Sequence, residues 1–211
     1  ITTMATPMAL ACLSLLLAAI GVAAVEGIDC RSIGLRVTEV YMDAPIKDIV
    51  WLEGQVVFAL TTKRTLYRSS DDGRKFTNVM SMLQDSDTAE PPFHDGVDAM
   101  YPSDADSKRL FLQGGGKTHW VTYDRGESFL RRRAHMPLGG VKMHKTQADY
   151  MLASRMSEKC YSRAKAGECD QDLYVSYDFG TSFRRAVRRV SQYDWGPSEN
   201  TVIYSAYSAR G

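Results

Sequence analysis

Three aspartates, each preceded two residues earlier by a hydroxyl, are the first candidates for chemistry in this chain. The pattern is S/T-x-D-x-G-x-x-F, and it spans residues 69–76, 122–129 and 176–183. A carboxylate beside a hydroxyl is the pairing used for proton transfer or for holding a cation through oxygen. Three equivalent copies cannot share one active site, and none has the alternating acidic residues of an EF-hand loop. We therefore predict that these aspartates are structural.

The pattern also predicts a hairpin turn. Hydroxyl and carboxylate oxygens accept hydrogen bonds from main-chain amides of a turn, and glycine adopts a positive φ at little cost. The closing phenylalanine is expected to fill the apolar layer between neighbouring sheets. The predicted Asp-box residues are Ser69, Asp71, Gly73, Phe76, Thr122, Asp124, Gly126, Phe129, Ser176, Asp178, Gly180 and Phe183.

The remaining reactive residue types form no recognisable centre. His94, His119, His135 and His144 are too scattered for a local metal motif. The chain has no G-x-S-x-G, H-E-x-x-H or Walker sequence and no G-x-G-x-x-G that opens a helix. We predict no catalytic residue, no metal site and no cofactor.

The tryptophans and the net charge give little sign of a ligand. Trp51 and Trp195 fall on the first strand of their repeats and Trp120 on a third strand, so we expect core positions rather than a sugar-stacking platform. With 26 basic and 25 acidic side chains the net charge is +1, which gives no reason to expect nucleic acid. The arginines at 131–133 and 184–189 are interpreted as solvated strand edges, with a phosphate or partner site as the alternative.

The spacing of the repeated Asp-box pattern indicates the fold. Asp71, Asp124 and Asp178 lie 53 and 54 residues apart, a period typical of a four-stranded propeller blade. Strand-like runs recur at 47–51, 56–60, 65–68 and 77–79, at 96–100, 109–112, 118–121 and 130–132, and at 141–143, 150–153, 172–175 and 184–187. A fourth unit begins with runs at 192–196 and 201–204. We predict an all-β, Asp-box (BNR-type) β-propeller over residues 46–211, with about three blades and part of a fourth.

The first residues read as a targeting segment. Residues 8–25 carry no charge and end in the small residues Val22, Ala23 and Ala24, which suits cleavage by signal peptidase. We predict a signal peptide over residues 4–24, and the alternative is a membrane anchor. Because Ile1–Thr3 precede the first methionine and no second hydrophobic span follows, we expect the chain to be an N-terminal fragment of a longer protein.

Three cysteines remain after such cleavage in an oxidising compartment. Cys160 and Cys169 bracket a short polar segment that a disulfide can close, so we predict that they pair. A zinc site is the alternative, although no C-x-x-C pair is present. Cys30 is left without a partner, which again suggests a missing downstream part.

The third repeat resembles the sortilin and vacuolar-protein-sorting receptor family. Its order is an apolar strand at 150–153, the two cysteines, a strand running into Asp178-Phe179-Gly180, and then Tyr193-Asp194-Trp195-Gly196. The resemblance implies the lumenal part of a ten-bladed propeller, followed by a cysteine-rich module and one membrane span. It implies a receptor that carries soluble secretory cargo from the Golgi to endosomes, lysosomes or the vacuole, and it gives no individual cargo-binding residue.

A second function stays open on the sequence. Asp boxes also occur in sialidase-type glycosidases, which need an arginine cluster and a tyrosine nucleophile with a carboxylate partner. Such sialidases usually show an R-I-P segment before the first box, and no arginine before Asp71 is followed by Ile-Pro. We expect a binding protein and not an enzyme, with a secreted glycosidase as the alternative.

Overall fold

The computed structural model describes residues 38–84, 96–156 and 171–206. The chain divides into residues 1–39 and 40–211, and every element given below belongs to the second unit. The predicted signal peptide and Cys30, Cys160 and Cys169 lie outside the described residues.

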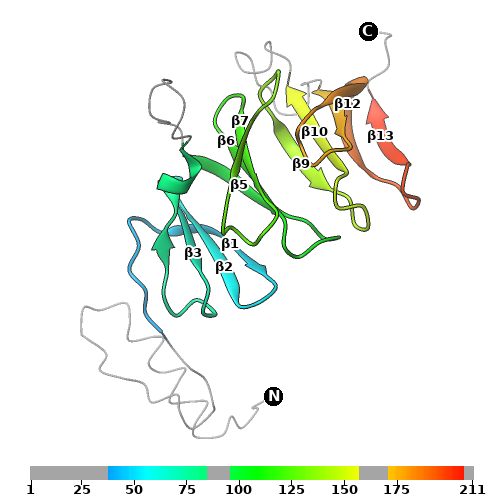
Figure 1. The fold of residues 1–211 in the computed structure, drawn as a ribbon. Coiled ribbons are helices and arrows are strands. Elements are labelled where there is room, and N and C mark those ends of the chain that lie inside the picture. The colour runs from blue at the N-terminus through cyan, green and yellow to red at the C-terminus, as the bar shows by residue number, and fades with distance from the viewer. Residues whose placement is uncertain (1–37, 85–95, 157–170, 207–211) are drawn as a thin grey trace, which may run out of the picture. The chain divides into compact units, whose positions relative to one another are not determined.

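Three antiparallel sheets make up the described chain, and they follow one another in sequence order from cyan to red in Figure 1. The first contains β1 (Ile46–Leu52), β2 (Val56–Thr61), β3 (Leu66–Ser69) and β4 (Thr77–Asn78). The second contains β5 (Val97–Pro102), β6 (Leu110–Gly114), β7 (Thr118–Thr122) and β8 (Leu130–Arg133). The third contains β9 (Gly139–Met143), β10 (Met151–Met156), β11 (Gln171–Ser176), β12 (Arg184–Trp195) and β13 (Val202–Ala206). A short 3-10 helix, Met80–Leu83, follows β4.

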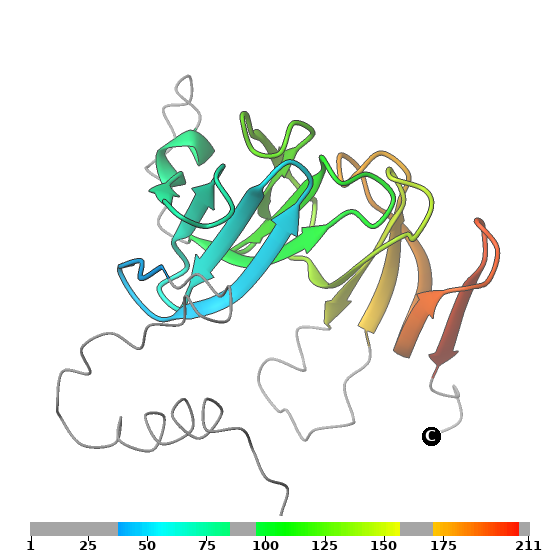
Figure 2. The ribbon, with the colours of Figure 1, turned by 90° about the horizontal axis from the view of Figure 1, so that it is seen from below.

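Each strand pairs with its neighbour in sequence, so every sheet is a meander. The second strands are almost continuously apolar because both of their faces are covered: all six residues of β2 are buried. Edge strands have the opposite character, and β8 carries three arginines of which none is buried. Figure 2 shows the strands of each sheet running side by side.

Adjacent sheets share a core. Phe58, Leu60 and Leu66 of the first sheet form one buried cluster with Leu112 and Trp120 of the second. A second cluster joins the second sheet to the third, with Phe111 and Val121 on one side and Met151, Tyr174 and Phe183 on the other. Four-stranded meanders packed face to face are the blades of a β-propeller. The predicted all-β propeller fold is therefore confirmed.

The two strands of the predicted fourth unit are joined to the third sheet without a break. The first part of β12 pairs with β11, and its last residues, Gln192–Trp195, pair with β13. The strand changes partner where Arg189 adopts a φ of 59° and the register shifts between Val190 and Gln192. A left-handed residue bends the strand without ending it.

One expectation about the tryptophans is wrong. Trp120 is fully buried as predicted, and Trp195 is partly buried, but Trp51 is 69% exposed. The cause is the pleat of β1: Val50 and Leu52 face the shared core, so Trp51 between them points to the other face.

Candidate functional site

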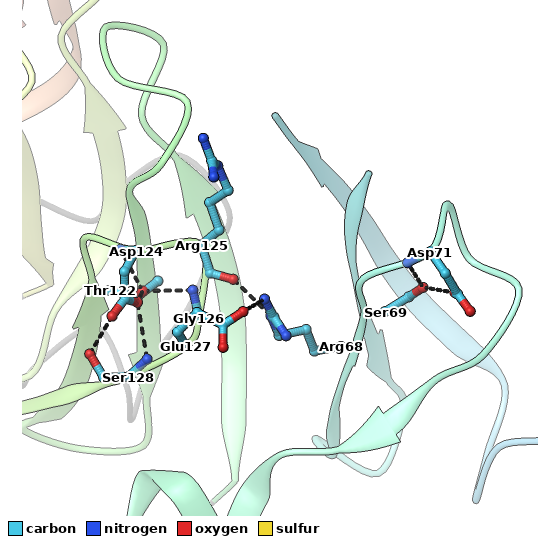
Figure 3. Close-up of polar contacts among 9 residues, drawn as sticks. All are labelled: Arg68, Ser69, Asp71, Thr122, Asp124, Arg125, Gly126, Glu127 and Ser128. Atoms are coloured by element: carbon cyan, nitrogen blue, oxygen red, sulfur yellow. Dashed lines mark hydrogen bonds and ion pairs between the residues drawn. The ribbon is translucent and has the colours of Figure 1, made fainter. Parts of the chain in front are cut away.

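The three predicted turns, hereafter the Asp turns (residues 69–76, 122–129 and 176–183), share a set of hydrogen bonds. In the second one, Thr122 Oγ1 donates to Asp124 Oδ1 at 2.7 Å and accepts the amide N–H of Gly126 at 2.8 Å (Figure 3). Asp124 Oδ1 also accepts the amide N–H of Ser128 at 3.0 Å. The hydroxyl-to-carboxylate bond recurs at 2.7 Å between Ser69 and Asp71 and at 2.8 Å between Ser176 and Asp178. Each carboxylate therefore accepts hydrogen bonds from groups of its own turn.

These bonds keep the carboxyl groups ionised. Burial raises the pKa of Asp124, but hydrogen bonds from Ser128 and Thr122 outweigh it, and the pKa lies below its ordinary value. Asp178 behaves in the same way through Ser182 and Ser176. An aspartate with a lowered pKa is a poor general acid near neutral pH.

Each Asp turn is also tied to the first hairpin of its own sheet. The residue after the aspartate is left-handed in all three turns, with φ of 59°, 59° and 51° at Asp72, Arg125 and Phe179. Its amide N–H donates to the carbonyl oxygen of Gln55, Lys108 or Asp149, at 3.0, 2.9 and 2.8 Å respectively. The glycine that follows has a positive φ as well, so the chain reverses over two successive left-handed residues.

The glycines of the second and third Asp turns contact the preceding sheet. A Cβ on Gly126 would lie 2.4 Å from Phe58 Cζ, and a Cβ on Gly180 would lie 2.7 Å from Phe111 Cε2. The closing side chain Phe129 meets Phe58 edge to face with centroids 6.4 Å apart. These turns therefore lock one sheet onto the next as well as closing a hairpin.

An arginine of the first sheet binds to the second Asp turn, which belongs to the second sheet. Arg68 Nε donates to the carbonyl oxygen of Arg125 at 2.8 Å, and its guanidinium forms an ion pair with Glu127 (Figure 3). In the third Asp turn a histidine of the preceding sheet makes a different contact: His119 Nε2 lies 2.9 Å from the carbonyl oxygen of Gly180. His119 is 1% exposed, and its Nδ1 is buried with no hydrogen-bond partner among the described residues.

A second repeated loop escaped the sequence analysis. It joins the first two strands of a sheet, and the amide of its first residue donates to the carbonyl of its last: Ser103 to Arg109 at 3.1 Å and His144 to Tyr150 at 3.0 Å. Ser103 Oγ accepts the amide of Asp106 at 3.2 Å, and His144 Nδ1 accepts that of Gln147 at 3.1 Å. The two loops have the same length, from Ser103 to Arg109 and from His144 to Tyr150. Their residue types differ too much for the sequence alone to show that the loop is repeated.

A cavity of about 620 Å³ opens beside the second of these loops. Side chains that line it include His144, Lys145, Thr146, Trp195, Ser198 and Glu199. It lies between the loop that follows β9 and the turn that joins β12 to β13. None of the predicted Asp-turn residues borders it.

Other kinds of site find no support in the described part of the chain. No group of three or more His, Cys, Asp or Glu side chains there is arranged to hold a metal ion. Within the same residues, no helix has the length and apolar character needed to cross a membrane.

Comparison with known proteins decides the family. The family model described as "Sortilin, neurotensin receptor 3" (Sortilin-Vps10) matches residues 64–211. The chain belongs to the Sortilin-Vps10 family. It is 20% identical over 172 residues to the vacuolar protein sorting/targeting protein 10 of Schizosaccharomyces pombe (strain 972 / ATCC 24843), a match that covers 76% of this chain and 11% of that protein. The predicted resemblance is therefore confirmed for this Sortilin-Vps10 chain.

The chain is also similar to solved structures of GH74 enzymes. The GH74 enzyme of Niastella koreensis matches with a TM-score of 0.47 and 14% identity, over 67% of this chain and 22% of that one. An ancestral GH74 enzyme matches with a TM-score of 0.49 and 15% identity, over 76% and 22% respectively. At these scores the likeness bears on neither the activity nor the ligand of the Sortilin-Vps10 chain.

Proposed function

We propose that this chain is the cargo-binding lumenal part of a sortilin-type receptor that carries soluble proteins from the Golgi to endosomes and on to the lysosome or vacuole. The observation that carries the proposal is the match of the Sortilin-Vps10 model to residues 64–211. The chain spans only 11% of its Schizosaccharomyces pombe relative, so the membrane anchor and further lumenal modules are proposed on the family alone.

The Asp turns give no support to a catalytic role for their carboxylates. We assign Asp71, Asp124 and Asp178 to stabilising the blades, because each carboxylate accepts the hydroxyl and amide hydrogen bonds of its own turn. A general acid or base needs a group that exchanges its proton near the working pH. We therefore propose a receptor without enzymatic activity, cofactor or nucleic-acid partner.

The secretory features of the chain belong to the same proposal. A signal peptide over residues 4–24 would deliver it to the oxidising lumen, where Cys160 and Cys169 would pair. Both features lie outside the described residues and are open to direct test: N-terminal sequencing of the secreted chain locates the cleavage, and peptide mapping without reductant locates the disulfide.

The decisive experiment removes the gene and follows soluble hydrolases of the lysosome or vacuole. We expect these hydrolases to appear in the medium, and we expect the full-length gene to restore their retention. Normal retention in the deleted strain would overturn the receptor function. Release of a fluorogenic sialoside by the purified chain would point to the glycosidase alternative instead.

A further inference from the structure

Trp195 forms a fixed aromatic wall of the cavity beside the His144 loop. Its indole Nε1–H donates to the carbonyl oxygen of Lys142 on β9 at 3.3 Å, and its ring packs against the buried cluster of Leu152 and neighbours. His144 meets the same ring edge to face, with centroids 4.6 Å apart. The indole is therefore held from two sides, while it remains only partly buried and borders the cavity.

His144, which also lines the cavity, has a ring nitrogen that no protein group among the described residues satisfies. The ring is 5% exposed, and Nδ1 accepts the amide N–H groups of Thr146 and Gln147, both at 3.1 Å. An Nδ1 that accepts leaves the proton on Nε2 in the neutral ring. Nε2 is buried and has no hydrogen-bond partner among the described residues. A buried donor without an acceptor is costly, and a ligand oxygen that reaches it would offset that cost.

The other walls are polar and carry charges of both signs. Thr146 and Ser198 contribute hydroxyls, Lys145 contributes a positive charge and Glu199 a negative one. Asp194 also borders the cavity, but its carboxylate is paired with Lys142 Nζ at 2.7 Å. Such a lining has no strong field of either sign, which disfavours a highly charged ligand.

We propose that this cavity binds a neutral pyranose unit of an oligosaccharide. The C–H face of a sugar ring packs on an aromatic side chain, and its hydroxyls donate to carboxylates and accept from N–H groups, as the lining offers. The volume is within the range of small-molecule sites. An apolar peptide anchor fits less well, because Trp195 and Pro197 are the only lining side chains among the described residues that are predominantly apolar.

We take the source of this sugar to be the glycan of a soluble cargo glycoprotein, and this source rests on the proposed function. The sugar site and the receptor function can be disproved separately. If hydrolases are retained by the receptor but no oligosaccharide binds here, only the sugar site is wrong. If sugars bind here but hydrolase retention does not need the gene, the receptor function is wrong.

Saturation-transfer NMR on the full chain tests the site with mannotriose, cellotriose and chitotriose as probes. We expect transfer to the ring protons of at least one of them. Trp195→Ala should weaken its affinity at least about tenfold. Trp51→Ala is the matched control, because Trp51 is 69% exposed and is not a lining residue, and it should leave the affinity unchanged.

A second pair of variants guards against misfolding of Trp195→Ala. Lys145→Ala and Glu199→Ala change exposed lining residues, and each should weaken the same sugar without lowering the melting temperature. Ribonuclease B and ribonuclease A, which share a polypeptide but differ in a high-mannose glycan, identify the source. Binding of ribonuclease B alone supports a glycoprotein ligand. Binding of the free sugars but of neither ribonuclease overturns the glycoprotein source, and equal binding of both ribonucleases or no transfer to any sugar overturns the site.

Discussion

Gly126 of the second Asp turn lies directly against the ring of Phe58 in the preceding sheet. The ideal Cβ position on Gly126 is 2.4 Å from Phe58 Cζ, and the backbone there has a φ of 78°. Gly180 and Phe111 repeat the relationship one sheet later. In the second and third Asp turns the glycine is therefore required for two reasons: the conformation of its own turn and the close approach of the preceding blade.

Gly126→Ala is expected to destabilise the chain by about 3 kcal/mol, since the left-handed conformation and the clash with Phe58 each contribute. Chemical denaturation measures the change. Gly116→Ala is the matched control: its φ is 63°, but no atom lies within 4 Å of the added Cβ, so only about 1 kcal/mol should be lost. The double variant Gly126→Ala/Phe58→Leu should recover part of the loss. Equal effects of the two alanine substitutions would show that Phe58 does not constrain the turn.

Asp124→Asn should lower the free energy of unfolding by about 1–2 kcal/mol, because charge-assisted hydrogen bonds from Thr122 and Ser128 are lost. Asp72→Asn is the control in the first Asp turn, where Asp72 is exposed and left-handed, a conformation that asparagine accepts. Because the folded pKa of Asp124 is lowered, its stabilising effect is present above about pH 4 and is lost as the pH falls through the folded pKa. Denaturation series at pH 3 and pH 7 should show a smaller effect of Asp124→Asn at pH 3.

His119 predicts a loss of stability at mildly acidic pH. Burial lowers its pKa, the hydrogen bond with the carbonyl oxygen of Gly180 opposes this shift, and the charge of Arg132 lowers the pKa further. A base with a lowered folded pKa gives full stability above its unfolded pKa of about 6.5, and loses it as the pH falls through the folded value. The melting temperature should therefore fall between pH 7.5 and pH 5.

His119→Gln should remove much of that pH dependence, because glutamine keeps a donor for the carbonyl oxygen of Gly180 and does not titrate. His135→Gln changes an exposed histidine and should leave the pH dependence intact. A profile that is the same in the wild type and His119→Gln would rule out His119 as its source.

Arg68→Ala is expected to cost about 1–2 kcal/mol, because it removes a hydrogen bond to the carbonyl oxygen of Arg125 and an ion pair with Glu127 across two sheets. Arg74→Ala, at an exposed position of the first Asp turn, should stay within about 0.5 kcal/mol of the wild type. Hydrogen exchange of the second Asp turn gives an independent reading: its amides should lose protection in Arg68→Ala and keep it in Arg74→Ala.

Local patterns determined the strands and the turns of this protein. The repeat of Asp71, Asp124 and Asp178 predicts three hairpins, because the hydrogen bonds of such a turn join residues at most four positions apart. Alternating and continuous apolar runs predict the strands for the same reason, since they reflect a period of two along one segment. The family resemblance rests on the same repeated order.

Contacts between sheets were decided only by the tertiary structure. Nothing near Gly126 in sequence points to Phe58, and nothing near His119 points to Gly180, because each pair joins segments more than fifty residues apart. Trp51 and Trp195 occupy similar places in their repeats, yet Trp51 is largely exposed while Trp195 borders the cavity beside His144. The sequence shows which side chains of a strand share a face, because successive side chains alternate between the two faces. What covers that face, and which polar groups stay unpaired there, depends on how one blade packs against the next.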